Sequence, residues 1–435
     1  MMSNMKFLMM RKLRLLFLAL AFFALAVSCN KNEPDIRPGW VERPSGFSNR
    51  YALDEMVVLS RHNIRSPLSG GGSVLSRITP HSWFEWTSKP SELSVKGGEL
   101  EVIMGGFFRE WVDQENLFDG KQPAANETRF YSNSLQRTIA TTSNFINGMY
   151  PSSGFKVEHH MTLGTMDPVF NPQTTGVDDA FQTLALNEIA AMGGADGFVG
   201  LGRKMASNFT LLEQVLDIKD SPAAKNDTLT IATDDVKITI KDFAEPSMKG
   251  GLKMACSASD ALTLQYYEET DDAKASFGHN LSFSDWEKIT AIKEWYQEVL
   301  FTSPAVAKNV SALMINEIRS ELLLPNRKFT FLCGHDSNLG SVMAALHCKK
   351  FDLTDALEKS TPIGGKLVFE KWHGKDGKEY IDMLLVYASA SQLRAKSNLS
   401  LSTPPSYVKL EISGLPANAD GLYRMDDFLA YLESL

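Results

Sequence analysis

The residues best suited to chemistry lie in a short motif near the amino end of the chain, Arg61-His62-Asn63-Ile64-Arg65-Ser66-Pro67. The apolar run 57–59 leads into this motif, and the proline that follows it stops any regular element. We interpret the pattern as a buried strand that feeds an active-site loop. Two guanidinium groups beside one imidazole suit a phosphate, because arginine offers a planar fork of donors and keeps its charge. The imidazole of His62 can then be the nucleophile.

A second motif of the same kind lies far downstream, where the apolar run 329–333 ends in Gly334-His335-Asp336. The next residues place Leu339, Val342 and Leu346 on one face of a helix. Two strands that each end in a charged loop with a histidine predict one crevice at the carboxyl edge of a parallel sheet. An isolated R-H-x-x-R motif suits a solvated surface loop equally well, so the presence of both motifs favours the active-site interpretation.

With both motifs in this order, the chain resembles the histidine acid phosphatases, a branch of the histidine phosphatase superfamily with R-H-x-x-R-x-P near its start and H-D near its end. It is more similar to the periplasmic glucose-1-phosphatases, which also have phytase activity, than to the acid phytases. Asn63 stands where most relatives carry Gly, as in the glucose-1-phosphatase branch. Further segments similar to that branch are 133–138 (NSLQRT), 164–168 (GTMDP), 264–268 (LQYYE) and 361–366 (TPIGGK).

The resemblance implies an α/β fold: a mostly parallel sheet flanked by helices, of the phosphoglycerate-mutase type, with an inserted and mainly helical cap domain. We expect the core to comprise 46–150 and 281–435. The cap is expected at 151–280, where the composition shifts to Met, Ala, Asn and Asp with irregular periodicity. Strands are expected at 366–371 and 380–387, on either side of a Gly-Lys-Asp-Gly turn. Ser284-Asp285-Trp286-Glu287 has the form of a capping box at the start of a helix.

The resemblance also extends the set of site residues. Arg137 matches a third phosphate-binding arginine of the family. Glu245 matches a substrate-contacting glutamate of the glucose-1-phosphatase branch, where a carboxylate could accept hydrogen bonds from sugar hydroxyls and repel highly phosphorylated ligands. Acid phytases carry an acidic residue where this chain has Asn133, and this departure is expected to change how the histidine is oriented or tuned.

These residues predict covalent phosphoryl transfer, in which His62 attacks phosphorus and forms a phosphohistidine that water hydrolyses. The equatorial oxygens are expected to bind to Arg61, Arg65, Arg137 and His335. Beside a phosphate the neutral form of Asp336 is favoured, so it can protonate the leaving oxygen and then activate water. No metal or other cofactor is expected, because the arginines neutralise the phosphate. They should also lower the pKa of His62 and allow activity at mildly acidic pH.

The first residues predict export from the cytoplasm. Lys6, Arg11, Lys12 and Arg14 precede the apolar run 15–27, which is too short for a spanning helix and is typical of a signal peptide over 1–28. The sequence Ala26-Val27-Ser28-Cys29 resembles a bacterial lipobox, so Cys29 is the expected lipidation site and 29–45 the tether. An ordinary signal peptide with an incidental cysteine is the alternative. The predicted location is the periplasm or the outer membrane, with a lipid as the only membrane anchor.

Charge and cysteine content limit the partners. Removal of four signal-peptide cations takes the formal net charge from −8 to −12, which disfavours nucleic acid as a ligand. A small phosphate monoester is the expected partner, and the sequence gives no oligomeric state. Cys256, Cys333 and Cys348 remain after Cys29, and neither a disulfide nor a metal site follows from their spacing.

Several other functions remain as alternatives. Inositol phosphates, phytate in particular, would satisfy the same phosphate site and could be the main substrate. A non-catalytic lipoprotein that binds sugar phosphates would keep the arginines but would not need Asp336. A mutase of the same superfamily would use a different acid residue. A metal-dependent phosphohydrolase needs further His and Asp ligands at set spacing, and the eight histidines of the sequence form no such cluster.

Overall fold

The computed structural model describes residues 39–68, 74–225, 231 and 235–435. The chain divides into two units, Met1–Glu42 and Arg43–Leu435, and the second holds all the elements below. The predicted signal peptide, Cys29 and the tether up to residue 38 lie outside the described residues. Within the described ranges, no helix combines the length and apolar character needed to cross a membrane.

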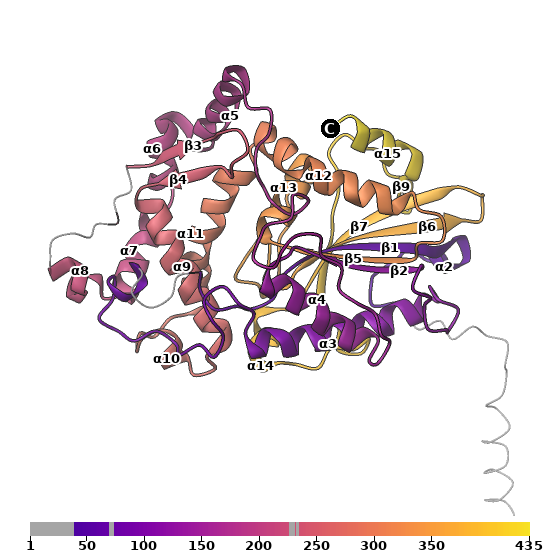
Figure 1. Ribbon diagram of the computed structural model, residues 1–435, viewed down its shortest axis with the longest axis horizontal. Coiled ribbons are helices and arrows are strands. Elements are labelled where there is room, and N and C mark those ends of the chain that lie inside the picture. Colours follow the sequence, from indigo (N-terminus) through magenta and orange to yellow (C-terminus); the bar gives the residue numbers. More distant parts are fainter. Residues whose placement is uncertain (1–38, 69–73, 226–230, 232–234) are drawn as a thin grey trace, which may run out of the picture. The chain divides into compact units, whose positions relative to one another are not determined.

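A seven-stranded sheet in the order β2-β5-β1-β6-β7-β8, with β9 paired to β7, forms the centre of the second unit (Figure 1). Its strands are β1 (Tyr51–Arg61), β2 (Thr128–Ser132), β5 (Phe329–Gly334), β6 (Lys366–Gly374), β7 (Glu379–Tyr387), β8 (Ser406–Lys409) and β9 (Tyr423–Arg424). The α/β class is confirmed, but the sheet is mixed. Only β2, β5 and β1 are parallel, and every pairing from β6 onward is antiparallel. A tight turn joins β6 to β7, and such a turn can only connect antiparallel strands.

Helices cover both faces of this sheet (Figure 1). One face carries α3 (Val95–Gln114) and α4 (Gln136–Met149), and the other carries α12 (Pro304–Leu322), α13 (Asp336–Ala345) and α15 (Met425–Glu433). Two short helices, α2 (Phe47–Arg50) and α14 (Ala390–Ala395), lie in connections. Helix α3 begins after a Ser94 cap whose side chain accepts a hydrogen bond from the Gly97 amide.

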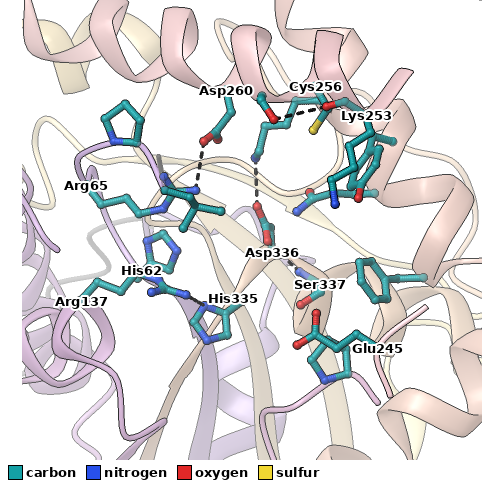
Figure 2. A pocket seen from close by; sticks show the side chains of 18 of the residues that line it. His62, Arg65, Arg137, Glu245, Lys253, Cys256, Asp260, His335, Asp336 and Ser337 are labelled. Atoms are coloured by element: carbon teal, nitrogen blue, oxygen red, sulfur yellow. Dashed lines mark hydrogen bonds and ion pairs between the residues drawn. The ribbon is translucent and has the colours of Figure 1, made fainter. Parts of the chain in front are cut away.

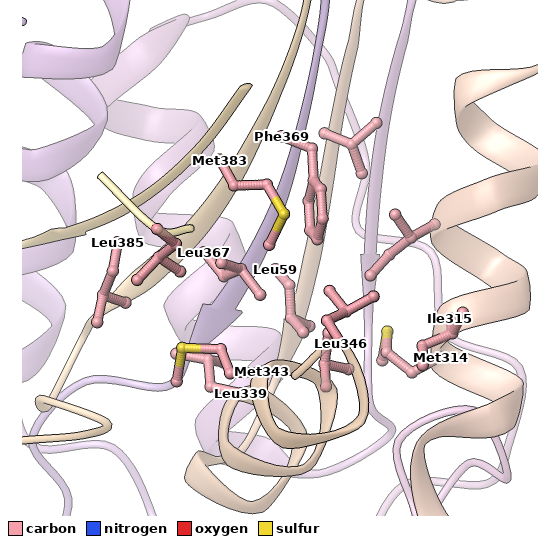
Figure 3. Packing of buried hydrophobic residues seen from close by; sticks show 14 of the residues in the cluster. Leu59, Met314, Ile315, Leu339, Met343, Leu346, Leu367, Phe369, Met383 and Leu385 are labelled. Carbon is pink, nitrogen blue, oxygen red and sulfur yellow. The ribbon is translucent and has the colours of Figure 1, made fainter. Parts of the chain in front are cut away.

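Alternate residues of each central strand face the two helical layers. Leu59, Leu332 and Leu367 pack with Met343 of α13 and Met314 of α12 in one cluster (Figure 3). On the opposite face, the Phe145 ring of α4 stacks on Phe331 with a centroid distance of 4.2 Å. The core strands are therefore buried on both sides, as their continuous apolar runs indicated.

A mainly helical region follows the first part of the sheet. It contains α5 (Asp179–Met192), α6 (Gly197–Arg203), α7 (Ala206–Val215), α8 (Pro222–Lys225), α9 (Gly251–Glu268), α10 (Asp272–Ala275), α11 (Phe283–Phe301), the hairpin β3 (Lys237–Thr239) and β4 (Ser247–Lys249), and the 3-10 turns η2 (Gly194–Asp196) and η3 (Ile218–Asp220); η1 (Val74–Ser76) precedes α3. Helix α11 begins after the expected boundary at 280 and packs on α9 and α7. The domain boundaries themselves stay a prediction. The capping box of α11 forms between Ser282 and Asp285, two residues before the expected position.

Two glycines allow α3 and α4 to pack closely under the first motif. A Cβ atom at Gly105 would lie 2.2 Å from the Phe145 carbonyl oxygen, and one at Gly148 would lie 2.0 Å from that of Val102. Helix α3 also supports the loop after β1, because the Ser94 amide donates to the Ile64 carbonyl at 2.9 Å. The close contact of the two helices therefore fixes one wall of the loop.

We predict opposite effects for alanine at two adjacent positions of α3. Gly105→Ala should destabilise the protein by about 1–3 kcal/mol, because the new methyl group meets the α4 backbone. Gly106→Ala should stabilise it by about 0.5–1 kcal/mol, since the nearest atom to a Cβ there is 4.0 Å away and Ala is the better helix former. Urea denaturation of the two variants measures the difference, and equal stabilities would contradict this packing.

Candidate active site

The parallel strands place the two histidine motifs side by side. Arg61 pairs with Gly334 in register, so His62 and His335 follow the ends of β1 and β5 at the same edge of the sheet. The His62 amide donates to the Gly334 carbonyl at 3.0 Å, and the two imidazole centroids lie 5.5 Å apart. Strand β2 ends beside them at Asn133, whose amide donates to the Cys333 carbonyl at 2.9 Å.

The loop after β1 rests on a fully buried ion pair. The Asn63 amide group donates to Glu101 Oε1 at 2.8 Å. Lys366 Nζ donates to both carboxylate oxygens of Glu101 at 3.1 Å, and it also contacts Ser60 Oγ at 3.1 Å. Both charged side chains have no exposed surface. A charge buried in this way costs free energy unless it is paired, so the pair and its hydrogen bonds constrain the loop to one position.

The tautomer of His62 follows from its own loop. Its Nδ1 lies 2.9 Å from the Asn63 carbonyl oxygen, which can only accept, so Nδ1 carries the proton and Nε2 is left unprotonated. Burial and the positive charges of Arg137 and Arg65 hold the pKa of His62 well below its usual value. The expected lowering of the His62 pKa is confirmed, and burial contributes more to it than either arginine charge does. The lowered pKa favours the neutral imidazole, whose unprotonated Nε2 is able to act as a nucleophile.

His62 lines a pocket of about 320 Å³ together with most of the predicted site residues, Arg65, Arg137, Glu245, His335 and Asp336. Figure 2 shows Arg65, His62, Arg137 and His335 on one side, Asp336 and Ser337 near the middle, and Glu245 on the far side. Arg61 does not line the pocket. Its NH1 donates to Glu358 at 3.1 Å and its NH2 lies 3.4 Å from Asp336, so it sits behind the wall.

The three arginines keep donors available for an anion. Arg65 NH2 donates to Asp260 at 3.1 Å. The buried Nε–H groups of Arg61, Arg65 and Arg137 have no hydrogen-bond partner within the described part of the chain. Burial and the nearby Arg65 charge lower the pKa of Arg137 to about 10, which still leaves it charged at neutral pH. Unpaired buried donors are costly, and an oxyanion in the pocket could pair with them.

Asp336 is the first residue of α13 and is paired with a lysine that sequence reasoning missed. Lys293 Nζ of α11 donates to Asp336 Oδ2 at 2.9 Å, and only 4% of the Lys293 side chain is exposed. Burial alone would raise the pKa of Asp336, but the charges of Lys293 and Arg61 lower it well below its usual range. The carboxyl group is therefore ionised in the protein by itself, whereas the neutral form was expected beside a phosphate.

The orientation of Asn133 determines the tautomer of His335. Asn133 Oδ1 accepts from the Ser134 and Asp167 amides at 2.8 and 2.9 Å, so its NH₂ group faces His335 Nε2, 2.7 Å away. Nε2 must then accept, and Nδ1 carries the proton. Arg137 NH2 lies 3.5 Å from this Nδ1. His335 thus offers an N–H donor on the side of Arg137.

Glu245 approaches the pocket from the segment before β4. The Thr174 amide donates to the neighbouring Ala244 carbonyl at 3.0 Å and fixes this segment. Burial raises the pKa of Glu245, and the charge of Arg137 opposes the increase. The carboxylate lies across the pocket from the arginines (Figure 2), where it could meet the part of a ligand that is not the phosphate.

Three residues that hold the site together were not among the sequence candidates: Lys293, Asp260 and Glu358. They lie on α11, on α9 and in the loop before β6, and no local pattern marks them. Asp260 lies shortly before segment 264–268, which resembles the family. This proximity was the one sequence feature that pointed to any of the three residues. Cys256, Cys333 and Cys348 are all free thiols.

Comparisons with known proteins show the family and the fold of the chain. The family model described as histidine phosphatase superfamily (branch 2) matches residues 52–386. A glucose-1-phosphatase from Providencia rettgeri is 41% identical over 384 residues, covering 86% of this chain and 90% of that protein. A second, from Salmonella typhimurium, is 39% identical over 387 residues, covering 87% and 91%. The phytase of Hafnia alvei in complex with myo-inositol hexakis sulphate superposes with a TM-score of 0.80 at 24% identity, covering 90% of this chain and 98% of that one.

The contact between Asn133 and His335 predicts the effect of an acidic residue here. Asn133→Asp replaces a donor to Nε2 with a carboxylate, which favours the imidazolium, so the pKa of His335 should rise by about one to three pH units. NMR titration of the histidine ring signals measures this change. Ser134→Ala, which leaves both partners in place, serves as the control, and an unchanged His335 titration in Asn133→Asp would contradict the assigned contact.

Proposed function

Because the chain belongs to the histidine phosphatase superfamily (branch 2) and is a phosphomonoesterase, we propose that it hydrolyses sugar phosphates such as glucose 1-phosphate through a phosphohistidine on His62. One observation carries the proposal. Within a single pocket, a neutral imidazole with a free Nε2 lies among cationic donors, with a carboxyl group on the neighbouring strand end. This arrangement suits a nucleophile, an oxyanion site and a proton donor.

In the first step, Nε2 of His62 attacks phosphorus in line with the ester oxygen, and the P–O bond to the sugar breaks as the P–N bond forms. Arg65, Arg137 and the Nδ1–H of His335 stabilise the equatorial oxygens. Arg61 is proposed to contribute its charge and its Nε–H from behind the wall. Positioning and charge stabilisation are the main contributions of a protein to phosphoryl transfer. These donors are therefore proposed to supply most of the rate enhancement.

Asp336 is proposed to move the proton in both steps. A phosphate monoester has a second pKa near 6, so at mildly acidic pH it enters with a proton that the nearby carboxylate can accept. Asp336 then protonates the departing sugar oxygen. Once the neutral sugar leaves, Lys293 again favours the carboxylate, which can take a proton from the water that attacks the phosphohistidine.

The pocket favours a small substrate. Its volume of about 320 Å³ is at the low end of ligand pockets, which suits a hexose monophosphate. Glu245 is proposed to accept hydrogen bonds from sugar hydroxyls. The same carboxylate would repel the additional phosphates of phytate, so phytate is proposed as a secondary substrate.

The location of the enzyme is proposed from the sequence alone. Residues 1–28 would direct export, and acylation of Cys29 would anchor the protein to a membrane. Cys29→Ser should then move the protein from the membrane fraction to the soluble fraction. Continued membrane association of that variant would refute the anchor without affecting the proposed chemistry.

Replacement of the proposed acid should depend on the leaving group. Asp336→Asn should lower kcat/KM for glucose 1-phosphate by about 10²–10⁴-fold, because the departing alkoxide needs a proton. The loss for 4-nitrophenyl phosphate should be much smaller, since its leaving oxygen needs little protonation. Asp260→Asn, which removes another pocket carboxylate, should affect both substrates alike. Equal losses for both substrates in Asp336→Asn would exclude the acid role.

Variants of Glu245 separate hydrogen bonding from charge. Glu245→Ala should lower kcat/KM for glucose 1-phosphate by about tenfold or more, the value of a hydrogen bond to a charged group, and leave 4-nitrophenyl phosphate nearly unchanged. Glu245→Gln should retain part of the glucose 1-phosphate activity. Both variants should hydrolyse phytate faster, because both remove the negative charge. If all three substrates respond equally, Glu245 does not select the substrate.

A further inference from the structure

A separate group of possible metal ligands lies where the loop after η1 meets the helical region, outside the phosphate pocket. His81 Nε2 lies 2.7 Å from Asp217 Oδ2, and His279 Nε2 lies 3.1 Å from the same oxygen. One ligand atom from each of the three residues falls within 4.8 Å of the others. The side chains are partly exposed, by 30%, 38% and 33% for His81, Asp217 and His279, so an ion could reach them.

The three residues come from three different segments. His81 lies in the loop after η1, Asp217 immediately precedes η3, and His279 follows α10. The histidines are 136 and 62 positions from Asp217 in the sequence, which is why no spacing pattern revealed them and why the eight histidines formed no visible cluster. The expectation that the histidines form no metal-type cluster is wrong at this place.

Aromatic packing orients one of the ligands. The Phe277 ring stacks on His81 with a centroid distance of 4.9 Å and an interplanar angle of 13°. The rings of Trp83 and Phe277 pack edge to face with a centroid distance of 5.2 Å. The imidazole of His81 is thus fixed from one side, and its Nε2 is directed at Asp217. A preorganised imidazole loses less conformational entropy when it binds an ion.

We propose that His81, Asp217 and His279 bind a divalent transition metal, with Zn²⁺ as the best match. Two neutral imidazoles and one carboxylate form a common zinc donor set, and water can complete a tetrahedron. With zinc–ligand bonds of about 2.0–2.1 Å, tetrahedral ligand atoms lie about 3.3 Å apart. The present N···O distances of 2.7 and 3.1 Å would lengthen by about 0.6 and 0.2 Å to reach this separation.

The site has a structural role, since none of its residues lines the phosphate pocket. A bound ion would join the loop after η1 to the segments around η3 and α10 of the helical region. A ligand that binds only the folded chain raises stability by mass action. The metal is therefore expected to change the melting temperature and to leave the phosphatase reaction itself unaltered.

The test is a zinc titration of the metal-free protein by isothermal calorimetry, followed by thermal denaturation with and without ZnCl₂. Wild type should bind one more equivalent of zinc than the double variant His81→Asn/His279→Asn. At a zinc concentration near a hundred times Kd, its melting temperature should rise by about 3 °C, a rise absent from the double variant. Any zinc bound by the active-site histidines would be present in both proteins, so it would not change the difference in zinc stoichiometry between them.

Two further variants separate metal binding from hydrogen bonding. Asp217→Asn keeps an acceptor oxygen for both imidazoles but removes the charge, so zinc affinity should fall by about tenfold or more. His373→Ala, which removes an exposed histidine of β6, should bind zinc as wild type does. Equal zinc stoichiometry in wild type and the double variant, or full affinity in Asp217→Asn, would overturn the proposal, and the three residues would then form a hydrogen-bonded group only.

Discussion

The buried Lys366–Glu101 ion pair is the constraint on which the active site depends. Neither side chain reaches solvent, and the pair is connected to the loop after β1 through the Asn63 side chain. Lys366 also donates to the Gly364 carbonyl at 3.0 Å, so the loop before β6 is held by the same group. Because the desolvated charges need every one of these partners, the loop has one favourable arrangement. That arrangement places the Asn63 carbonyl against His62 Nδ1.

The electrostatics of the pocket follow from burial as much as from charge. His62 is neutral because it is desolvated among guanidinium groups, whereas Asp336 is ionised despite burial because Lys293 and Arg61 lie beside it. A cationic pocket in a chain with a formal net charge of −8 must be local, and the arginines are partly balanced by Asp260 and Glu358. The Nε–H groups of Arg61, Arg65 and Arg137 have no hydrogen-bond partner within the described residues, so these donors are left for an anion. The pairing of these charges therefore determines which donors remain for an anion, and the nearby cations help to keep His62 neutral.

The sequence was sufficient for the features that are local in the chain. His62 and His335 were identified because apolar runs that end in charged residues mark strand ends, and parallel pairing of β1 and β5 brings those ends together. The turn at 374–377 was enough to predict that β6 and β7 are antiparallel, but the family-level expectation of a mostly parallel sheet did not show that β6 also runs antiparallel to β1. Lys293 was missed because a lysine on a helix has no signature, and only tertiary packing shows that it contacts Asp336. The same reason applies to His81 and His279, which become neighbours only through Asp217.

The most direct test of the account is to trap the covalent intermediate during turnover. Wild-type enzyme is mixed with a phosphorus-labelled aryl phosphate, denatured in alkali, where phosphohistidine survives, and mapped by peptide mass spectrometry. The account predicts a phosphoryl group on Nε2 of His62 and none on His335. It also predicts that His62→Ala forms no adduct. Steady turnover without label on His62, or label on His335 instead, would contradict it.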